Sequence, residues 1–444
     1  MSLQFRSGTA EFKKLAIKST VADVTMQFKN LMAEMSYYES IDSPAVSMTL
    51  SIIDGTDFKY SLPILGGETV DYSFFESGGG LSETARSIVG NISGVIQGRM
   101  RLYKLANDRR VKREVSTYDL FLTSPEMFLD PHKSINLAVK SMRVSDIVKQ
   151  LFDDRVSRVG GKRLVTIDET DGLQSFAFNG GSPFTAINQL ASEAKMVGRD
   201  SSSYFFFYED NEGYHFVSLE TLFKKTPKHK YYYLEDVVSG DDIHEKMRLI
   251  SMHHDVSFDI LNGSIHGQFG TRSSFIDPVA KMFSSVDYTM KDFPLLQRMS
   301  GGVKTISDSV SSEIGSVPTR EKYVVSDAAR RYSDYIVQRE PETQNTFMRR
   351  PLFIATEEAT KNQLKSNVIK IAAHGNSTLR AGDVIEIIVP ASGKRSLGEV
   401  TNKSVSGRYL ITALCHRITA IGNYVTTMEC VRDSFAEPLE TGVF

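Results

Sequence analysis

Cysteine, charge of one sign and long apolar runs are all scarce in this chain of 444 residues. Two cysteines exclude a disulfide-stapled scaffold, and a net charge of −2 argues against a dedicated nucleic-acid binder, because neutralising phosphates requires a basic surface. No run approaches the ~18 apolar residues of a membrane span, and the N-terminal segment lacks the apolar core of a signal peptide. These absences predict a protein that is synthesised in a cytoplasm and keeps its thiols reduced.

The rest of the composition is typical of a folded, soluble protein. Hydrophobic residues make up 41% of the chain and charged residues 24%, which excludes a disordered, coiled-coil or membrane protein. A chain of this length is too long for one ordinary core and predicts roughly two to four domains.

Both cysteines occur in one stretch, ITALCHRITAIGNYVTTMECVRDS. Its halves are rich in Ile, Thr, Val and Tyr and flank Gly422-Asn423, a pattern that predicts two antiparallel strands joined by a two-residue loop. Cys415 and His416 are neighbours in the first predicted strand, so their side chains point to opposite faces of the sheet. A thiol–imidazole catalytic pair is therefore not expected.

The same hairpin predicts which residues face each other. Counting outward from a two-residue loop sets Cys415 opposite Cys430 and His416 opposite Glu429. We expect the two thiols to remain reduced and to act as small packing residues on one face of the sheet.

Residues 1–130 form a predicted strand-rich unit with short turns, a sandwich or a barrel. Strand-like alternation or β-rich composition occurs in ADVTMQFKN, VSMTLSIID, ETVDYSFF and STYDLFLTS. Residues 76–99 interrupt this series and carry six glycines, too many for a compact strand or a long helix. We expect a mobile surface insertion there.

Residues 131–246 and 291–363 are predicted to form a mixed α/β middle domain. RVSDIVKQLFDD is typical of a helix capped by Ser145, and GSPFTAINQLASEAKM of a helix capped by Ser182. After the second of these predicted helices, the aromatic stretch SYFFFYEDNEGYHFVSLETL predicts a hairpin that turns at Asp210–Gly213.

Strand patterns return in residues 247–290 and 364–436, which we expect to form a second barrel. The clearest are NVIKIAAHG, GDVIEIIVP, GRYLITALCHRIT and NYVTTMECVRD. The Ser- and Gly-rich MSGGVKTISDSVSSEIGSV predicts a loop or linker, and VSDAARRYSDYIVQRE predicts a helix.

Candidate metal ligands are weak. His253-His254-Asp255 contains the spacing of iron sites with two histidines and a carboxylate, but such a site needs a distant second histidine in a pocket. A solvated or hydrogen-bonded strand connection explains these residues better. His244 in HEKMR lacks the second histidine of a zinc-protease helix.

Candidate phosphate-binding and nucleophilic sites are equally weak. Gly263, Gly267 and Gly270 in NGSIHGQFG lack the Lys-Ser/Thr ending and the following helix of a phosphate loop, so bends in a strand explain them better. No Ser-His-Asp arrangement or nucleophile elbow occurs. We expect no catalytic, cofactor-binding or metal-binding residues, and not an enzyme. A metal-dependent hydrolase that uses His253 and Asp255 is the remote alternative.

Six phrases in order resemble the baseplate tail hub proteins of contractile-tailed phages. They cover residues from about Val21 to Phe435, and their order is more specific than any one of them. The phrases are YYESIDSPAVSMTLSIIDG, SLPILGGETVDYSF, YDLFLTSPEMF, FNGGSPFTAINQLASEAK with SSSYFFFYEDNEGYHFVSLETL, LRAGDVIEIIVP, and SGRYLITALCHRITAIGNYVTTMECVRDSF.

This resemblance implies an α+β, mostly β protein with two tube-like antiparallel β-barrels flanking a mixed middle domain. It also implies a homotrimeric structural protein of the virion. This trimer would adapt a hexameric tail tube to a trimeric central spike and take part in DNA ejection. The main implied partners are the tail tube and central spike proteins. The tape measure and baseplate wedge proteins are secondary implied partners. DNA would pass through the channel without specific binding.

Two features limit the resemblance. The insertion at residues 76–99 and the Ser-rich passage at 300–316 belong to no phrase of the family. The related spike base of a bacterial contractile injection system shares the barrels and is the alternative. Because no long spike-forming β-repeat follows the last strand, we expect the phage hub. No lysozyme-like segment is appended, so we expect any peptidoglycan cleavage to reside on another chain.

Overall fold

The computed structural model of the protein describes residues 8–21, 24–77, 94–197, 204–233, 247–277, 281–289, 299, 308–315, 317–325, 357, 359–364, 367–390 and 401–435. Most of the insertion predicted at 76–99, the helix predicted in VSDAARRYSDYIVQRE and His244 lie outside these residues.

One sheet of thirteen strands organises the fold, which confirms a mostly β protein of the α+β type. The alternation seen in the sequence is the cause: in β7 (Val115–Thr123), Tyr118, Leu120 and Leu122 are buried and their neighbours are not. The other N-terminal strands are β1 (Thr9–Lys18), β2 (Thr25–Gln27), β3 (Met32–Ser40), β4 (Ser47–Asp54), β5 (Thr69–Ser77) and β6 (Val95–Lys112). The remaining strands of this sheet are β13 (His229–Tyr232), β14 (Leu249–Val256), β18 (Val368–His374), β19 (Val384–Ile388), β20 (Gly407–Thr419) and β21 (Tyr424–Val431).

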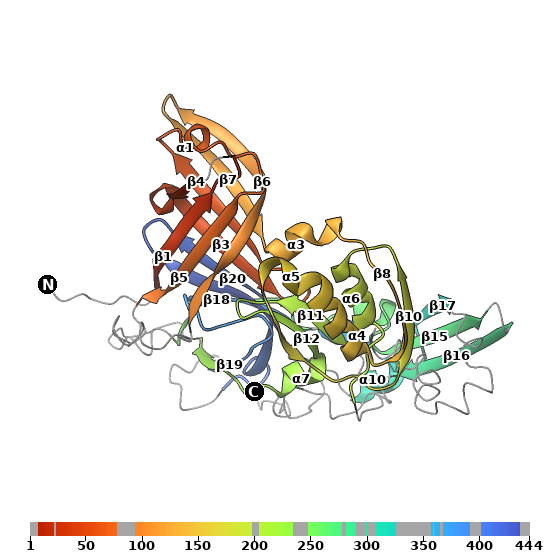
Figure 1. Ribbon diagram of the computed structural model, residues 1–444. Helices are drawn as coiled ribbons and strands as arrows, with labels where there is room; N and C mark the ends of the chain where they lie inside the picture. The colour runs from red at the N-terminus through yellow and green to blue at the C-terminus, as the bar shows by residue number, and fades with distance from the viewer. Residues whose placement is uncertain are drawn as a thin grey trace.

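Six N-terminal strands and the tip of a C-terminal hairpin close into what we call the first strand ring (Figure 1). β3, β4, β7, β6, β5 and β1 pair in that order, and β3 also pairs with β20. β1 closes the circuit at the β20–β21 loop, where the Ala10 N–H donates to the Gly422 carbonyl over 3.0 Å. Ile418 and Tyr424 of the hairpin are accordingly buried in the core of this ring.

A second strand ring forms from β14, β18, β21, β20, β19 and β13, paired in that order. It closes where the Tyr232 N–H of β13 donates to the Met247 carbonyl over 2.8 Å, just before β14. Its core is largely aliphatic, with Ile371, Ile387 and Leu410 buried.

β20 belongs to both rings. Its first residues, from Gly407 to Leu410, pair with β19, whereas the segment from Ala413 to Thr419 pairs with β3. The register with β21 shifts between Ile411 and Ala413, and such a bulge bends a strand and increases its twist. One bent strand thus carries the backbone hydrogen bonding from the second strand ring into the first.

The expected second barrel differs from the observed pairing in one respect. β15 (Gly270–Asp277) pairs with both β16 (Met282–Thr289) and β17 (Arg320–Val325) in a separate three-stranded sheet. Alternation identifies a strand but not the sheet that it joins, because its partners are chosen by distant contacts. The domain boundaries inferred from the sequence stay predictions.

A mixed α/β module lies beside the first strand ring and contains the expected aromatic hairpin (Figure 1). α4 and α6 contact each other, α6 contacts β11, and their apolar faces share one core with the aromatic strands. β11 and β12 flank the predicted turn at Asp210–Gly213. The elements of the module are α3 (Pro125–Leu129), β8 (Asn136–Met142), α4 (Val144–Leu151), α5 (Ser157–Gly160), β9 (Leu164–Ile167), β10 (Gln174–Asn179), α6 (Pro183–Ala191), β11 (Phe205–Glu209), β12 (Tyr214–Ser218) and α7 (Leu219–Lys224).

Helix starts were predicted with mixed success. Ser182 is the N-cap of α6, and its hydroxyl accepts from the Thr185 N–H over 3.4 Å, as expected. Ser145 is not a cap: Arg143 holds that position in α4, and Ser145 is buried within the first turn, where its N–H donates to the Thr170 hydroxyl over 2.9 Å. A tertiary partner therefore displaces the local capping role.

Two further expectations are wrong in part. The Ser-rich passage predicted as a loop contains α10 (Asp308–Ile314). ADVTMQFKN forms only the short β2, and its last residues enter a 3₁₀ turn at Lys29–Leu31. Phe28 is buried there, whereas Val24 is 47% exposed.

Candidate functional site

The cysteine hairpin has a different register from the predicted one. Four residues, 420–423, separate the end of β20 from the start of β21, and the last pair before the loop is Ile418 with Tyr424 rather than Ile421 with Tyr424. The shift sets Cys415 opposite Thr427, and the bulge then sets Cys430 opposite Ile411. The prediction that the two cysteines face each other is therefore wrong.

The wider loop has a clear physical cause. Gly422 takes a φ of +86°, its N–H donates to the Thr419 carbonyl over 2.9 Å, and the Thr419 N–H donates to the Asn423 carbonyl over 3.0 Å. The Gly422 carbonyl is used by β1, so the turn is shaped by ring closure as well as by its own residues. His416 consequently lies opposite Thr426 and not Glu429.

Cys415 and His416 do lie on opposite faces, as expected. His416 is fully buried in the first strand ring, where its Nδ1 lies 2.8 Å from the Tyr424 hydroxyl. Burial, with Arg380 nearby, holds the pKa of His416 well below its ordinary value. Cys415 is half-buried on the outer face, so no thiol–imidazole pair forms.

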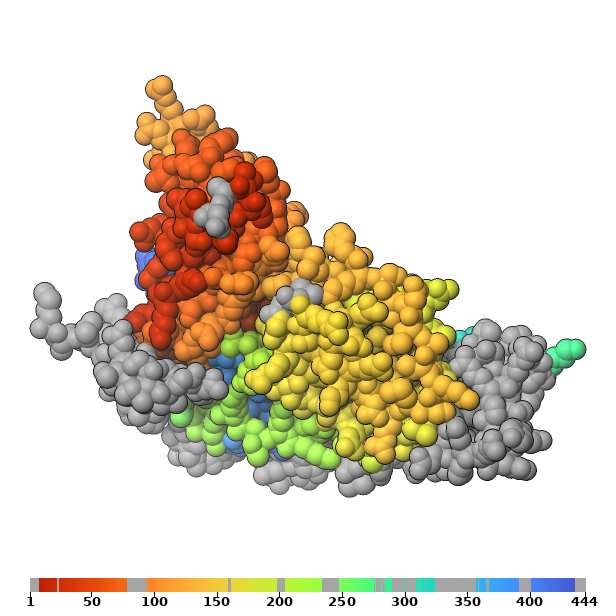
Figure 2. Space-filling model, in the orientation of Figure 1, coloured from red at the N-terminus to blue at the C-terminus, as the bar shows by residue number. Residues whose placement is uncertain are grey.

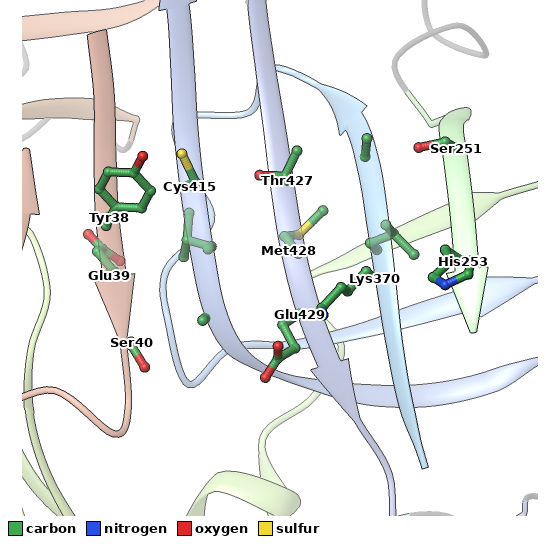
Figure 3. Close-up of a pocket in the computed structure, with 14 residues that line it drawn as sticks. Tyr38, Glu39, Ser40, Ser251, His253, Lys370, Cys415, Thr427, Met428 and Glu429 are labelled. Carbon is green, nitrogen blue, oxygen red and sulfur yellow. The ribbon is translucent and has the colours of Figure 1, made fainter. Parts of the chain in front are cut away.

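A shallow hollow of about 570 Å³ crosses this outer face (Figure 3). It spans five strands, from β3 through β20, β21 and β18 to β14. One row across it consists of directly paired residues with mostly small side chains: Tyr38, Cys415, Thr427, Ala372 and Ser251. The adjacent row consists of Ser40, Ala413, Glu429, Lys370 and His253.

The cations Lys370 and Arg417 on this face are each paired with a carboxylate. Lys370 Nζ lies 2.7 Å from Asp255 Oδ2, and the hydrogen bond from Lys370 holds the pKa of Asp255 below its ordinary value. The Arg417 guanidinium makes two hydrogen bonds of 2.7 Å to the Glu34 carboxylate. Opposite charges side by side in exposed positions leave little net field.

The candidate metal ligands lie on β14 and do not converge. His253 borders the hollow, and Asp255 is occupied by a lysine rather than by a second histidine. His254 points to the other face of the strand, where burial lowers its pKa. Among the described residues, no group of three His, Cys, Asp or Glu side chains is arranged to hold a metal ion.

The glycines of NGSIHGQFG do not mark bends in a strand, contrary to expectation. Gly263 lies in the short helix α9 (Ile260–Ile265), and Gly267 adopts a φ of +80° in the turn that follows it. Gly270 begins β15 and faces Pro318 so closely that a Cβ atom would lie 2.8 Å from the Val317 carbonyl. They shape a helix end and a close backbone contact.

A buried polar junction joins the α/β module to both strand rings, and nothing in the sequence predicted it. Its centre is Glu39 of β3, which is 1% exposed. One carboxylate oxygen accepts from the Asn211 N–H of the β11–β12 turn, and the other from the Ala381 N–H that precedes β19, both over 3.1 Å. A single side chain therefore links three parts of the chain.

Asn211 extends this junction to β6. Its side-chain oxygen accepts from the Gln97 N–H over 2.9 Å, and its amide donates to the Val95 carbonyl over 3.2 Å. The side-chain amide thus pairs with the strand as a peptide group would. The β11–β12 turn is therefore held by Glu39 of β3 and by the backbone of β6.

Opposing charges surround Glu39. Burial raises its pKa to about 7, with Arg380 acting in the opposite direction and Asp210 adding to the rise. Burial also acts to raise the pKa of Asp210, but the hydrogen bond of His215, whose Nε2 lies 3.0 Å away, and the charge of Arg380 outweigh it and hold that pKa low. Arg380 is buried as well and donates to the Ser377 and Leu379 carbonyls.

A second buried pair lies next to this junction. Lys162 donates to Glu209, whose other oxygen accepts from the Val46 N–H over 3.0 Å at the start of β4. Glu209 and Asp210 are adjacent at the end of β11, so one turn supplies both buried carboxylates. Sequence reasoning missed these residues because their partners lie far away along the chain.

Solved structures identify the fold that contains these features. No protein-family model matches the chain, and no curated protein matches its sequence. The 43 kDa tail protein of prophage MuSo2 from Shewanella oneidensis superposes with a TM-score of 0.54 at 13% identity, covering 95% of this chain and 99% of that one. A tail protein from Neisseria meningitidis MC58 gives 0.51 at 11% identity, covering 95% and 96%.

The chain has the fold of phage tail proteins. The resemblance inferred from the six phrases is thereby confirmed at the level of the fold, over nearly the whole chain. Among the described residues of this tail-protein fold, no helix has the length and apolar character needed to cross a membrane.

Proposed function

We propose that the protein is a structural component of a contractile phage tail, a trimeric baseplate hub between the hexameric tail tube and the trimeric central spike. The observation that carries this proposal is the pair of strand rings joined through β20, in a chain with the fold of phage tail proteins. Two rings per chain supply six similar positions when three chains meet, and cyclic closure leaves no open-ended array.

The outer face of the shared sheet suits the wall of a channel. One row across it carries mostly small side chains, and the Arg417 and Lys370 cations are neutralised by Glu34 and Asp255. A phosphate backbone is held by unpaired basic groups, so a face with paired charges would let DNA pass without retaining it. We assign the hollow in Figure 3 to this wall.

The proposed location is the tail baseplate of the virion, after assembly in the host cytoplasm. The proposed partners are the tail tube and central spike proteins, followed by the tape measure and baseplate wedge proteins. The domains are proposed as 1–130, 131–246 with 291–363, and 247–290 with 364–436.

Light scattering and electron microscopy of the purified protein test the proposal. We expect three copies per particle in the presence of the spike protein, and class averages with three-fold symmetry and a central channel. Compact monomers with a hydrolytic activity lost in His253→Ala would instead support the enzyme alternative. A stable dimer or a hexamer of this chain would contradict the hub.

A phage hub and the hub of a bacterial injection system share this geometry. Mass spectrometry of purified particles separates them, because a phage hub is recovered with capsid proteins and DNA-filled heads. Recovery in contractile particles without capsid proteins would transfer the proposal to an injection system and leave the trimer intact.

A further inference from the structure

The hairpin between β6 and β7 projects from the first strand ring. β6 contains 18 residues, against 9 in each of its neighbours β5 and β7. Its pairing with β5 ends at Arg101, so among the described strands the part from Leu102 to Lys112 pairs with β7 alone. Figures 1 and 2 show this hairpin standing out at the top of the molecule, beyond α1 (Phe58–Ser61).

The projecting end is strongly basic. Residues 109–113 contain four cations, and residues 107–114 are exposed throughout. We call Arg109, Arg110, Lys112 and Arg113 the basic tip. This concentration of one charge contrasts with the net charge of −2 for the whole chain.

Within the part of the chain that the structure describes, the basic tip is not neutralised by ion pairs. Asp108, one of the two acidic residues beside it, is taken by Lys59 of α1 over 2.6 Å. Among the described residues, no carboxylate forms an ion pair with any of the four cations. The Arg110 guanidinium donates instead to the Arg113 carbonyl, which fixes the turn and leaves the positive charge uncompensated.

Apolar side chains accompany these cations. Val111 of the hairpin is 59% exposed, Ile53 of β4 is 50% exposed and Tyr60 of α1 is 75% exposed. Ile53 and Arg109 both pair with Thr117, so they lie in one row across three strands. Arginine and tyrosine beside exposed aliphatic groups are typical of protein–protein contacts, whereas phosphate binding makes no use of Ile53 or Val111.

The hairpin is also held in place before any partner binds. The Lys59–Asp108 pair ties it to α1, and Lys59 lies over the Tyr60 ring at 5.1 Å from its centre. Preorganisation lowers the conformational entropy lost on binding. A fixed, cationic and partly apolar projection is suited to a preformed acidic surface.

We propose that the basic tip docks onto an acidic protein surface at the end of the first strand ring. The proposal rests on the proposed function, since it takes that surface to be part of another protein of the tail. Opposite charges would steer the two proteins together and set their relative orientation, and Ile53, Val111 and Tyr60 would become buried in the contact.

Site-specific photocrosslinking in assembled tails tests the docking. A photoreactive amino acid replaces Val111 in the full chain. This chain is supplied to a phage that lacks the gene, so that the tails assemble with it. We expect a crosslink to an Asp- or Glu-rich peptide of a different tail protein. A crosslink to DNA, a crosslink to a second copy of this chain, or no crosslink in intact tails would overturn the proposal.

Charge reversal supplies the second measurement. Arg109→Glu with Lys112→Glu should lower the crosslink yield at least tenfold, and lysines at the acidic positions of the crosslinked peptide should restore it. The matched control reverses two exposed lysines of the α/β module, Lys140→Glu with Lys149→Glu, and should leave the yield unchanged. Equal yields in all variants would show that charge plays no part.

The oligomeric state separates failure of this proposal from failure of the hub. The Arg109→Glu/Lys112→Glu variant should keep the melting temperature and the copy number of the wild type, because the basic tip lies outside both cores. If the wild type is not trimeric, the hub fails while the crosslink still reports the docking. If the wild type is trimeric and the crosslink is absent, only the docking fails.

Discussion

Cys415 and Cys430 occupy the two strands of one hairpin but belong to opposite faces. Cys415 pairs with Thr427, which is three residues from Cys430, and an odd offset reverses the direction of the side chain. Cys430 is 0% exposed in the core of the second strand ring, while Cys415 borders the outer hollow.

The first prediction concerns thiol chemistry. Burial raises the pKa of both thiols, more strongly for Cys430. Alkylation of the native protein should therefore modify Cys415 slowly and Cys430 only after unfolding. Cys430→Ser should cost about 1–3 kcal/mol by placing a hydroxyl in an apolar core, and Cys415→Ser, the matched control, less than about 0.5 kcal/mol. A quantitative disulfide in the intact mass would contradict the register.

The second prediction is a pH dependence that originates at Glu39. A carboxyl whose folded pKa is raised binds more protons when folded, so stability is highest below the unfolded value near 4.5 and falls as the pH rises through about 7. The loss amounts to at most about 3 kcal/mol. Urea unfolding of the wild type at pH 4.5, 6 and 8 should show this decline.

The matching variants isolate this group. Glu39→Gln should flatten the slope between pH 4.5 and 7, although losing one acceptor lowers its stability at every pH. Glu11→Gln changes an exposed carboxyl on β1 and should retain the wild-type slope. An unchanged slope in Glu39→Gln would mean that another group titrates in this range.

The third prediction tests the coupling of Arg380 with Glu39. Arg380→Met leaves two buried carboxylates without their cation and should cost about 3–5 kcal/mol. The double variant with Glu39→Gln should cost less than the sum of the two single variants, by about 0.5–3 kcal/mol. Additive losses in the denaturant midpoints would show that the two side chains act independently.

The fourth prediction concerns the amide of Asn211. Asn211→Ala removes both side-chain hydrogen bonds to β6 and should cost about 1–3 kcal/mol. Hydrogen exchange should accelerate at the Gln97 amide in particular. Asn211→Asp keeps the acceptor for that amide and should preserve its protection, so equal exchange in the two variants would argue against this contact.

The fifth prediction uses a close approach between β18 and the hairpin. A Cβ atom on Gly375 would lie 2.0 Å from the Tyr424 ring, which is buried in the first strand ring. Gly375→Ala should therefore destabilise the protein by about 1–3 kcal/mol or more through overpacking. Gly55→Ala, where the new Cβ meets Val115 at 3.9 Å, should be nearly neutral in the same thermal melt.

Local patterns predicted the strands and several turns of this protein. β4, β5, β7, β18, β19, β20 and β21 coincide with runs chosen for their alternation or β-branched content, and Ser182 was correctly identified as a cap. These features depend on residues close together in sequence, which is why the sequence reveals them.

Features that depend on distant partners were missed. The hairpin register was wrong because the Gly422 carbonyl bonds to β1, more than 400 residues earlier in the chain. Glu39, Asp210 and Arg380 gave no signal, since a buried charge can be recognised only once its partners are known. The same limit applied to Ser145, whose partner Thr170 lies 25 residues later, in the connection between β9 and β10.

The sharing of β20 has a consequence for how the protein is made. The ribosome releases β1 and β3 early, but the strand that closes the first ring between them begins at residue 407. Until that segment emerges, the edges of β1 and β3 stay open to other strands, including those of neighbouring nascent chains. The first ring can therefore close only after β20 has been translated, and a chaperone that covers these edges would be needed most before that point.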